Sequence, residues 1–284
     1  MKFKIIHKTE YEFSQAVFFE PHSFRFKPKN TPHLRLEYFK LFLSPKPVGL
    51  SEILDPENNF IHFSWFEGLF EKMEINVELI VDSKEYNPFN FLLYPSNCLT
   101  TPFDYPDSLK KILLPSLKQV KIKSELRQFG EKILKKTQFK TMDFLTNLTQ
   151  EIHQAFIVQY RETGEPMNPD ETFRLKCASC RDLAWMQIHL LRNLNFATRF
   201  VSGYYYIPVE KDTKSQFELH AWLEVYLPGA GWIGFDPSHG IVVANNHFIV
   251  SSSPDYENTM SVSGTIRGSA SSKMKTQLNI EILS

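Results

Sequence analysis

Cysteine is scarce in this chain, with three residues in 284: Cys98, Cys177 and Cys180. So few cysteines, in an odd number, exclude a disulfide framework and agree with a reducing compartment. Any chemistry at these thiols is therefore expected to be catalytic or metal-binding.

Long apolar runs are also missing. No stretch of the sequence approaches the roughly 20 apolar residues that a membrane-spanning helix needs. Residues 1–13 alternate charged and apolar side chains and lack the continuous apolar segment of a signal peptide. We therefore expect a cytoplasmic protein that does not contact membranes.

Neither sign of charge is in excess, since 32 Lys and Arg residues balance 32 Asp and Glu residues. Without a net positive field there is little to attract a polyanion, so nucleic acid is not expected as a partner. What is present is 42% hydrophobic and 23% charged residues. This composition is typical of a globular protein, and the length suggests two domains.

The first part of the chain has the period of two that is typical of β-strands. The pattern is clearest at 73–81, where every second residue is apolar. Residues 34–43 and 60–65 are further strand candidates, with turn-forming residues at 55–59 between them. An antiparallel β-sandwich buries many short strands, so we expect residues 1–90 to form an N-terminal β-sandwich domain.

Helical spacing begins after a proline-rich connection at 84–120. One helix is predicted from Thr141, with that residue as its N-cap. A second helix is predicted from Cys180 to Asn193, and its apolar residues occupy more than one face. Such a helix is expected to be central and buried.

Strand-like runs follow the second helix at 197–207, 218–227 and 232–236. Residues 251–273 are rich in Ser and Gly and are expected to be loop, and Leu278–Leu283 is expected to close the sheet as its last strand. We therefore predict an α+β protein whose second domain, residues 91–284, has a central helix packed on an antiparallel sheet.

The first candidate for chemistry is Cys180, which begins the predicted buried helix. Unpaired N–H groups and the helix dipole at a helix N-terminus favour an anion, so they lower the pKa of a thiol. A thiolate at this position would be a nucleophile.

Two further candidates, His220 and Asp236, lie on strands that could form a hairpin through the Pro- and Gly-containing turn at 227–231. If the turn is centred on Pro228, His220 stands directly opposite Asp236 and the carboxylate can hold the imidazole. A turn centred on Ala230 would offset the pair by four residues, or roughly 13 Å. The first register also places Trp222 opposite Gly234.

Other interpretations of these residues remain open. A lone Cys or His is often structural. Cys177 and Cys180 form a Cys-x-x-Cys that could bind zinc together with His220 or His239, although no second Cys-x-x-Cys or close His pair follows. A redox role is less favoured because the βαβ context is missing. The conjunction of Cys, His and Asp in compatible positions favours nucleophilic catalysis.

Three stretches resemble the core of bacterial transglutaminase-like proteins, often named as cysteine proteases: CASCRDLAW (177–185), LRNLNFATRFVSGYYY (191–206) and LHAWLEVYLPGAGWIGFDPSHG (219–240). Residues 1–83 resemble, more weakly, their N-terminal β-rich region. The resemblance implies a papain-like core and assigns Cys180, His220 and Asp236 as a catalytic triad. One departure is Ala178, where the family commonly has Gly.

The function implied is acyl transfer at an amide bond of a peptide or protein, without a cofactor or metal, by a peptidase or amidase. The Cys180 backbone N–H is one expected oxyanion donor. Tyr160 is a candidate for the second, and Trp222 and Trp232 are candidates for walls of the substrate cleft. The alternatives are a protein-glutamine transglutaminase that uses an amine acceptor and a non-catalytic module that binds peptides.

Overall fold

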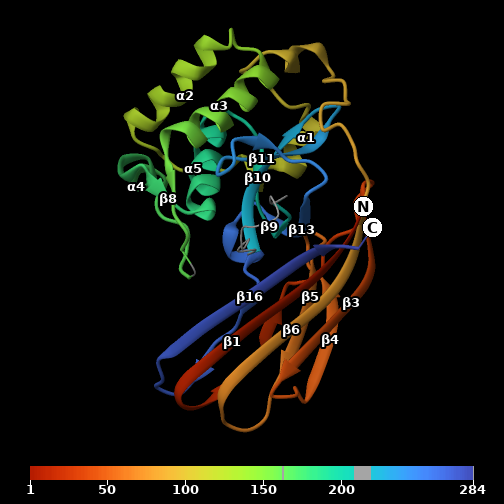
Figure 1. Cartoon of the computed structure of the whole chain (residues 1–284). Coiled ribbons are helices and arrows are strands. Elements are labelled where there is room, and N and C mark those ends of the chain that lie inside the picture. The colour runs from red at the N-terminus through yellow and green to blue at the C-terminus, as the bar shows by residue number, and fades with distance from the viewer. Residues whose placement is uncertain (162, 208–218, 284) are drawn as a thin grey trace, which may run out of the picture.

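The computed structural model of the protein describes residues 1–161, 163–207 and 219–283. Figure 1 shows two lobes, one made of long strands and one in which helices surround a second sheet. We call residues 1–83 with 262–283 the strand lobe, and the described residues from 84 to 261 the helix lobe. The two ends of the chain lie side by side where the lobes meet (Figure 1).

The strand lobe consists of two antiparallel sheets. Its elements are β1 (Lys2–Phe19), β2 (His22–Phe24), β3 (Leu34–Ser44), β4 (Gly49–Leu54), β5 (Phe60–Trp65), β6 (Phe70–Ser83), β14 (Val262–Ser263), β15 (Ile266–Arg267) and β16 (Ser272–Ile282). In one sheet β1 lies between β6 and β16, with β3 beyond β6 and β15 at the far end of β1. The other has the order β14-β2-β5-β4.

Apolar and polar side chains alternate along the strands, and this alternation explains why the strand lobe folds. Phe3 and Ile5 on β1 and Ile75, Val77 and Leu79 on β6 are almost fully buried, while their sequence neighbours are not. Burial of each such side chain stabilises the fold by about 1.5–3 kcal/mol. The N-terminal antiparallel sheets expected from the period of two are therefore confirmed, and the predicted strands at 34–43, 60–65 and 73–81 fall within β3, β5 and β6.

The C-terminal segment differs from our expectation. β16 pairs with β1 over eleven residues, from Phe3 opposite Ile282 to Phe13 opposite Ser272. It therefore belongs to the strand lobe and does not close the sheet of the helix lobe, because β1 offers an open edge. The expected loop at 251–273 also contains short strands, β14 and β15, that join the N-terminal sheets. Whether the chain divides into domains at residue 90 stays a prediction.

The helix lobe contains a five-stranded antiparallel sheet with the order β12-β11-β10-β9-β13. Its elements are η1 (Ser96–Leu99), α1 (Asp107–Leu113), η2 (Pro115–Leu117), α2 (Ser124–Lys136), α3 (Thr141–Ala155), β7 (Ile157–Val158), α4 (Pro169–Leu175), β8 (Cys177–Ala178), α5 (Cys180–Asn193), β9 (Thr198–Tyr205), β10 (Leu219–Leu227), β11 (Gly231–Asp236), β12 (Ile241–Val242), β13 (His247–Ser253) and η3 (Tyr256–Thr259).

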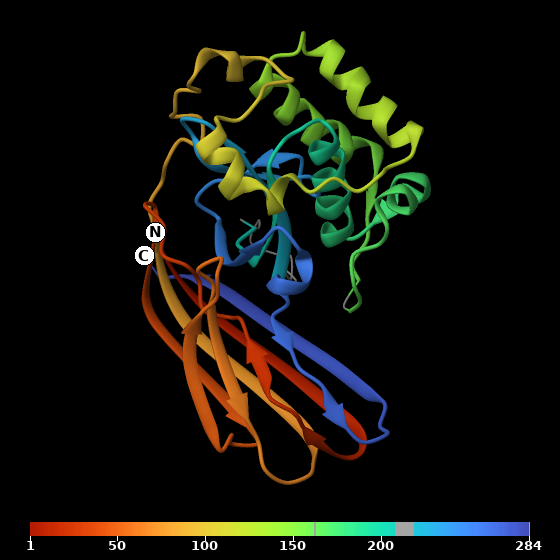
Figure 2. The same ribbon diagram turned by 180° about the vertical axis from the view of Figure 1, so that it is seen from behind.

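Helix α5 is the centre of this lobe, as its apolar pattern predicted. Leu183, Ile188 and Leu190 are fully buried, and Figures 1 and 2 show the helix between the outer helices and the sheet. Helix α3 begins at Thr141 as expected, but its N-cap is Lys140, and the Thr141 hydroxyl instead donates to the Cys98 carbonyl oxygen at 2.7 Å. In the part of the chain that the structure describes, no helix is both long and apolar enough to cross a bilayer.

Candidate active site

The start of α5 is fixed by a capping box, which places Cys180 as the first helical residue. One carboxylate oxygen of Asp182 accepts hydrogen bonds from the Ser179 N–H at 2.8 Å and the Ser179 hydroxyl at 2.7 Å. The other accepts from the Met167 N–H at 2.8 Å and from the Arg161 guanidinium at 2.5 Å. Asp182 is fully buried, so this network sets the turn that carries the thiol.

The β10–β11 hairpin brings His220 and Asp236 together in a register that differs from both predicted ones. The turn is centred on Gly229, between the Pro228 and Ala230 alternatives. Gly229 has φ +86°, a conformation that favours glycine. His220 therefore lies diagonally from Asp236 on the shared face, and the imidazole spans the offset: its Nε2 is 2.8 Å from Asp236 Oδ2.

This register also overturns the predicted pairing of Trp222 with Gly234. Gly234 stands opposite Glu224, and the space left by its missing side chain is filled by Val243, which a Cβ would approach to 2.6 Å. Trp222 is fully buried and packs against the His247 ring at 5.0 Å between centroids. Trp222 therefore packs against the rings of both His220 and His247.

His220 connects the carboxylate to the thiol. Its Nε2 is engaged by Asp236, and its side chain is also hydrogen-bonded to Cys180. Because Nε2 faces the carboxylate, Nδ1 is the ring nitrogen left for the sulfur. The three predicted residues thus form one continuous chain from the helix to the sheet.

Electrostatics within this chain favour the ionised forms. Burial disfavours charge on His220, but the Asp236 carboxylate and the Cys180 thiolate outweigh it and raise the pKa of His220 to about 10. Burial likewise opposes ionisation of Cys180, yet the His220 charge, its hydrogen bond and one from the Ala221 N–H lower the pKa of the thiol. Burial raises the pKa of Asp236, but its partners, chiefly His220, hold that pKa well below its usual range. The three groups thus favour one another's charged forms, which are the thiolate, the imidazolium and the carboxylate.

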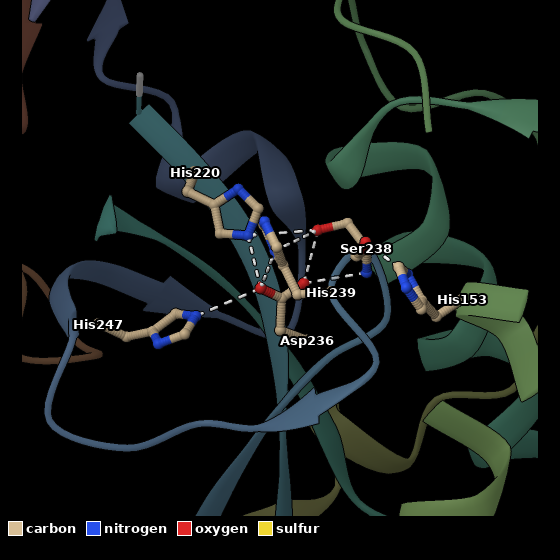
Figure 3. Close-up of polar contacts among 6 residues, drawn as sticks. All are labelled: His153, His220, Asp236, Ser238, His239 and His247. Atoms are coloured by element: carbon tan, nitrogen blue, oxygen red, sulfur yellow. Dashed lines mark hydrogen bonds and ion pairs between the residues drawn. The ribbon is translucent and has the colours of Figure 1, made fainter. Parts of the chain in front are cut away.

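Asp236 has more partners than the sequence indicated (Figure 3). Its Oδ2 also contacts His239 Nδ1 at 2.8 Å and His247 Nε2 at 3.3 Å. Its Oδ1 accepts from the Ser238 N–H at 3.0 Å and the Ser238 hydroxyl at 2.7 Å. Burial lowers the pKa of His247 to about 4, so this imidazole is neutral at pH 7 and donates to the carboxylate. The five contacts fix the carboxylate that holds His220.

Two clefts meet at Cys180 and His220. The larger has a volume of about 490 Å³ and lies between the helix lobe and the strand lobe. The smaller, of about 180 Å³, is bordered by Ser238 and His239. The half-buried Cys180 and His220 side chains are therefore reached by open space from both sides.

The candidate oxyanion donor and the two candidate cleft walls lie in different places. Tyr160 borders both clefts beside Cys180. Trp222 and Trp232 are not among the described residues that line either one. Trp232 instead packs beside the Tyr226 ring at 5.3 Å and under the Arg199 guanidinium at 4.2 Å, because its strand runs away from the thiol toward the turn.

The zinc alternative lacks the required geometry within the described residues. Among those residues, the donor atoms that lie close enough together to share a metal ion belong to His220, Asp236 and His247. This group contains no cysteine. Cys177 instead lies on β8 with its sulfur 3.0 Å from the Gln159 side-chain oxygen. The Cys-x-x-Cys spacing therefore does not build a metal site with the histidines.

Sequence reasoning missed several supporting residues. Ser179 and Asp182 have the Ser-x-x-Asp spacing of a capping box, which was a readable signal. His239 was considered only as a zinc ligand, and Ser238, which follows Asp236 by two residues, fits the local hydrogen bonding of an Asx turn. His247 gave no signal, because its contact with Asp236 depends on β13 crossing back beside β9.

Comparisons with known proteins agree with this architecture. Residues 3–82 match the model of the bacterial transglutaminase-like N-terminal region, and residues 127–237 match that of the transglutaminase-like superfamily. Uncharacterized proteins of Mycobacterium tuberculosis and Mycobacterium bovis are each 24% identical over 279 residues, which cover 93% of this chain and 87% of the relative.

A solved structure shares the whole fold. It is the crystal structure named "Putative Cysteine Protease" from Cytophaga hutchinsonii, with a TM-score of 0.72, 20% identity, and coverage of 100% of this chain and 91% of that one. The second matched region contains Cys180, His220 and Asp236. The two matches therefore place residues 127–237 in the transglutaminase-like superfamily and residues 3–82 in the N-terminal region found in bacterial transglutaminase-like proteins.

Proposed function

We propose that this protein is a cysteine-nucleophile enzyme that transfers acyl groups from amide bonds, and that it acts as a peptidase or amidase. The observation that carries the proposal is the chain of contacts from Cys180 through His220 to the buried Asp236, in which the pKa of the thiol is lowered although burial opposes its ionisation. A buried structural thiol would have a raised pKa, as burial gives Cys98. The transglutaminase-like core supports a cysteine-based enzyme.

In the first step, the Cys180 thiolate attacks the carbonyl carbon of the amide and forms a carbon–sulfur bond. The carbon–nitrogen bond then breaks, and His220 gives its Nδ1 proton to the departing amine. Asp236 keeps the other ring nitrogen protonated and fixes the ring in place throughout. The product of this step is a thioester on Cys180 and a free amine.

In the second step, neutral His220 takes a proton from water as the water oxygen attacks the thioester. The carbon–sulfur bond breaks, the acid product leaves, and the thiolate–imidazolium pair is restored. The Cys180 backbone N–H at the start of α5 is the proposed first donor to the oxyanion in both steps. Tyr160, at the junction of both clefts, is the proposed second donor.

The first test is labelling with iodoacetamide at pH 7, followed by mass spectrometry of the modified peptides. We expect Cys180 to react first, and Cys180→Ala to abolish turnover of a peptide library while the thermal unfolding temperature stays close to that of the parent. Cys177→Ala is the matched control and should retain turnover. Preferential labelling of Cys177 or Cys98, with turnover retained by Cys180→Ala, would sink the assignment.

The second test distinguishes the acceptor. With a fluorescent primary amine present, a hydrolase releases the free acid, whereas a transglutaminase incorporates the amine into a glutamine-containing protein. We expect the acid. A protein that binds library peptides but neither cleaves them nor incorporates the amine would be the non-catalytic module.

A further inference from the structure

The floor of the larger cleft comes from the strand lobe. On β1, His7, Thr9 and Tyr11 line it, and on β16, Met274 and Thr276 do so. These residues share the inner face of the sheet, since the alternate positions Lys8, Glu10, Lys275 and Gln277 line a separate hollow on the outer face. Figure 1 shows β1 and β16 running beneath the helix lobe. The N-terminal sheet thus extends its inner face under the proposed nucleophile.

The walls of this cleft are mainly uncharged. Phe200, Tyr256 and Met260 from the helix lobe face the strand-lobe floor. Among the described residues that line the cleft there is no Asp, Glu or Lys. The Arg181 guanidinium donates to the carbonyl oxygens of Gly164 at 2.6 Å and Arg161 at 2.7 Å.

A few polar groups of the floor are linked to one another. Thr9 Oγ1 lies 2.9 Å from Thr276 Oγ1 and 3.1 Å from His7 Nε2, and His7 Nδ1 lies 3.4 Å from the Tyr204 hydroxyl. Burial lowers the pKa of His7 to about 4, so the imidazole is neutral at pH 7. A mainly apolar cleft with a few fixed polar groups is typical of a site for an uncharged group. A charged side chain placed there would lose hydration, since the cationic groups in the lining are already engaged, Arg181 by two carbonyl oxygens and His220 by Asp236.

The acyl part of the substrate stays attached to Cys180 through both proposed steps, whereas the amine leaves after the first. The larger cleft therefore suits the acyl side. We propose that it binds the side chain on the acyl side of the scissile amide, that this side chain is uncharged and mainly apolar, such as Phe or Leu, and that the strand lobe selects it. This inference rests on the proposed role of Cys180.

The test uses peptide chloromethyl ketones that are identical except for Phe, Leu, Lys or Glu beside the electrophile. The sulfur displaces chloride, so the rate of Cys180 labelling reports the fit of that side chain. We expect the Phe and Leu reagents to react about tenfold or more faster than the Lys and Glu reagents. Iodoacetamide, which needs no cleft, gives the baseline reactivity of the thiol.

A matched pair of variants locates the selectivity. Met274→Glu puts a carboxylate on the cleft floor and should reverse the preference toward the Lys reagent. Gln277→Glu adds the same charge on the outer face of the same strand and should leave all four rates within about twofold. Gln277→Glu should also keep the iodoacetamide rate of the parent, the four rates of Met274→Glu are each divided by its own iodoacetamide rate, and circular dichroism shows that both variants are folded.

Equal rates for the four reagents, or no change in Met274→Glu, would overturn this inference while a normal iodoacetamide rate at Cys180 leaves the proposed function standing. Failure of iodoacetamide to select Cys180 would overturn both.

Discussion

At the scale of single residues, the pKa of Cys180 is set by burial, which raises it, and by His220, which is the main group that lowers it. Burial acts against the thiolate, and the imidazolium with its hydrogen bond reverses that effect. The imidazolium itself depends on Asp236, whose carboxylate, together with the Cys180 thiolate, outweighs the burial of the ring. Asp236 therefore controls the charge of the Cys180 thiol through His220. Two predictions test this dependence.

The first prediction concerns pH. The rate of Cys180 alkylation should rise with pH along a curve whose midpoint lies below that of an ordinary thiol, about 8.5, because the pKa of Cys180 is lowered. His220→Asn removes the imidazolium and leaves the effect of burial, so the midpoint should move above the ordinary value. Amidase activity should fall as the pH approaches 10, since the pKa of His220 is about 10 and the base form has no proton to donate.

Stopped-flow alkylation at a series of pH values measures both midpoints, with mass spectrometry to confirm the modified residue. An unchanged midpoint in His220→Asn would mean that the imidazole does not control the thiol.

The second prediction concerns Asp236→Asn. The amide removes the charge that keeps His220 protonated, so the pKa of His220 should fall and the pKa of Cys180 should rise. We expect turnover at pH 7 to drop by about 100-fold or more. Ser238→Ala removes one hydroxyl contact to the same carboxylate and should cost less than about tenfold. Comparable losses in the two variants would assign Asp236 a structural role.

At the scale of elements, α5 and the hairpin were the parts that the sequence predicted best. The apolar pattern predicted the bounds of α5 because a buried helix needs apolar residues on several faces. The shared face of His220 and Asp236 follows from the period of two alone. The register could not be predicted, because Pro228, Gly229 and Ala230 all fit a turn centre. His220 still contacts Asp236 because an imidazole is long enough to span a diagonal pair of strand positions.

A prediction at this scale concerns the cap of α5. Ser179→Ala removes the N-cap hydroxyl and should lower the free energy of unfolding by about 1 kcal/mol. Asp182→Ala leaves the Met167 N–H and the Ser179 N–H without their acceptor and should cost more, about 2–4 kcal/mol. It should also slow Cys180 alkylation, because the turn that carries the thiol loosens. Urea unfolding followed by circular dichroism measures the losses.

Asp143 is the matched control, since it lies in the first turn of α3 and is exposed. Asp143→Ala should cost only a few tenths of a kcal/mol. Equal destabilisation by Asp143→Ala and Asp182→Ala would contradict a special role for the α5 cap.

At the scale of the whole molecule, the partner of β16 was the feature that the sequence did not reveal. An apolar alternation at 278–282 predicts a strand, but not which of several sheet edges the strand joins. Pairing with β1 connects residues that are far apart in the chain, such as Thr9 and Thr276. The site histidine at 247 was missed for the same physical reason, because local patterns do not contain long-range contacts.

A prediction at this scale tests that pairing. Ile280 is almost fully buried in the strand-lobe core, and Ile280→Asp should lower the free energy of unfolding by about 3 kcal/mol or more. Asn279, its exposed neighbour, points to the other face, and Asn279→Asp should change stability by less than about 0.5 kcal/mol. Urea unfolding measures the free energy of unfolding of both variants. Equal values would mean that β16 does not pair with β1.

The pairing of β1 with β16 also fixes the order in which the protein becomes complete during synthesis. The helix lobe, with all three residues of the proposed triad, is synthesised before β16. The floor of the larger cleft needs Met274 and Thr276, so it cannot form until the chain has been extended through them. If the proposed function holds, a nascent chain carries the nucleophile before its substrate floor, and we expect selective cleavage only after β16 has docked on β1.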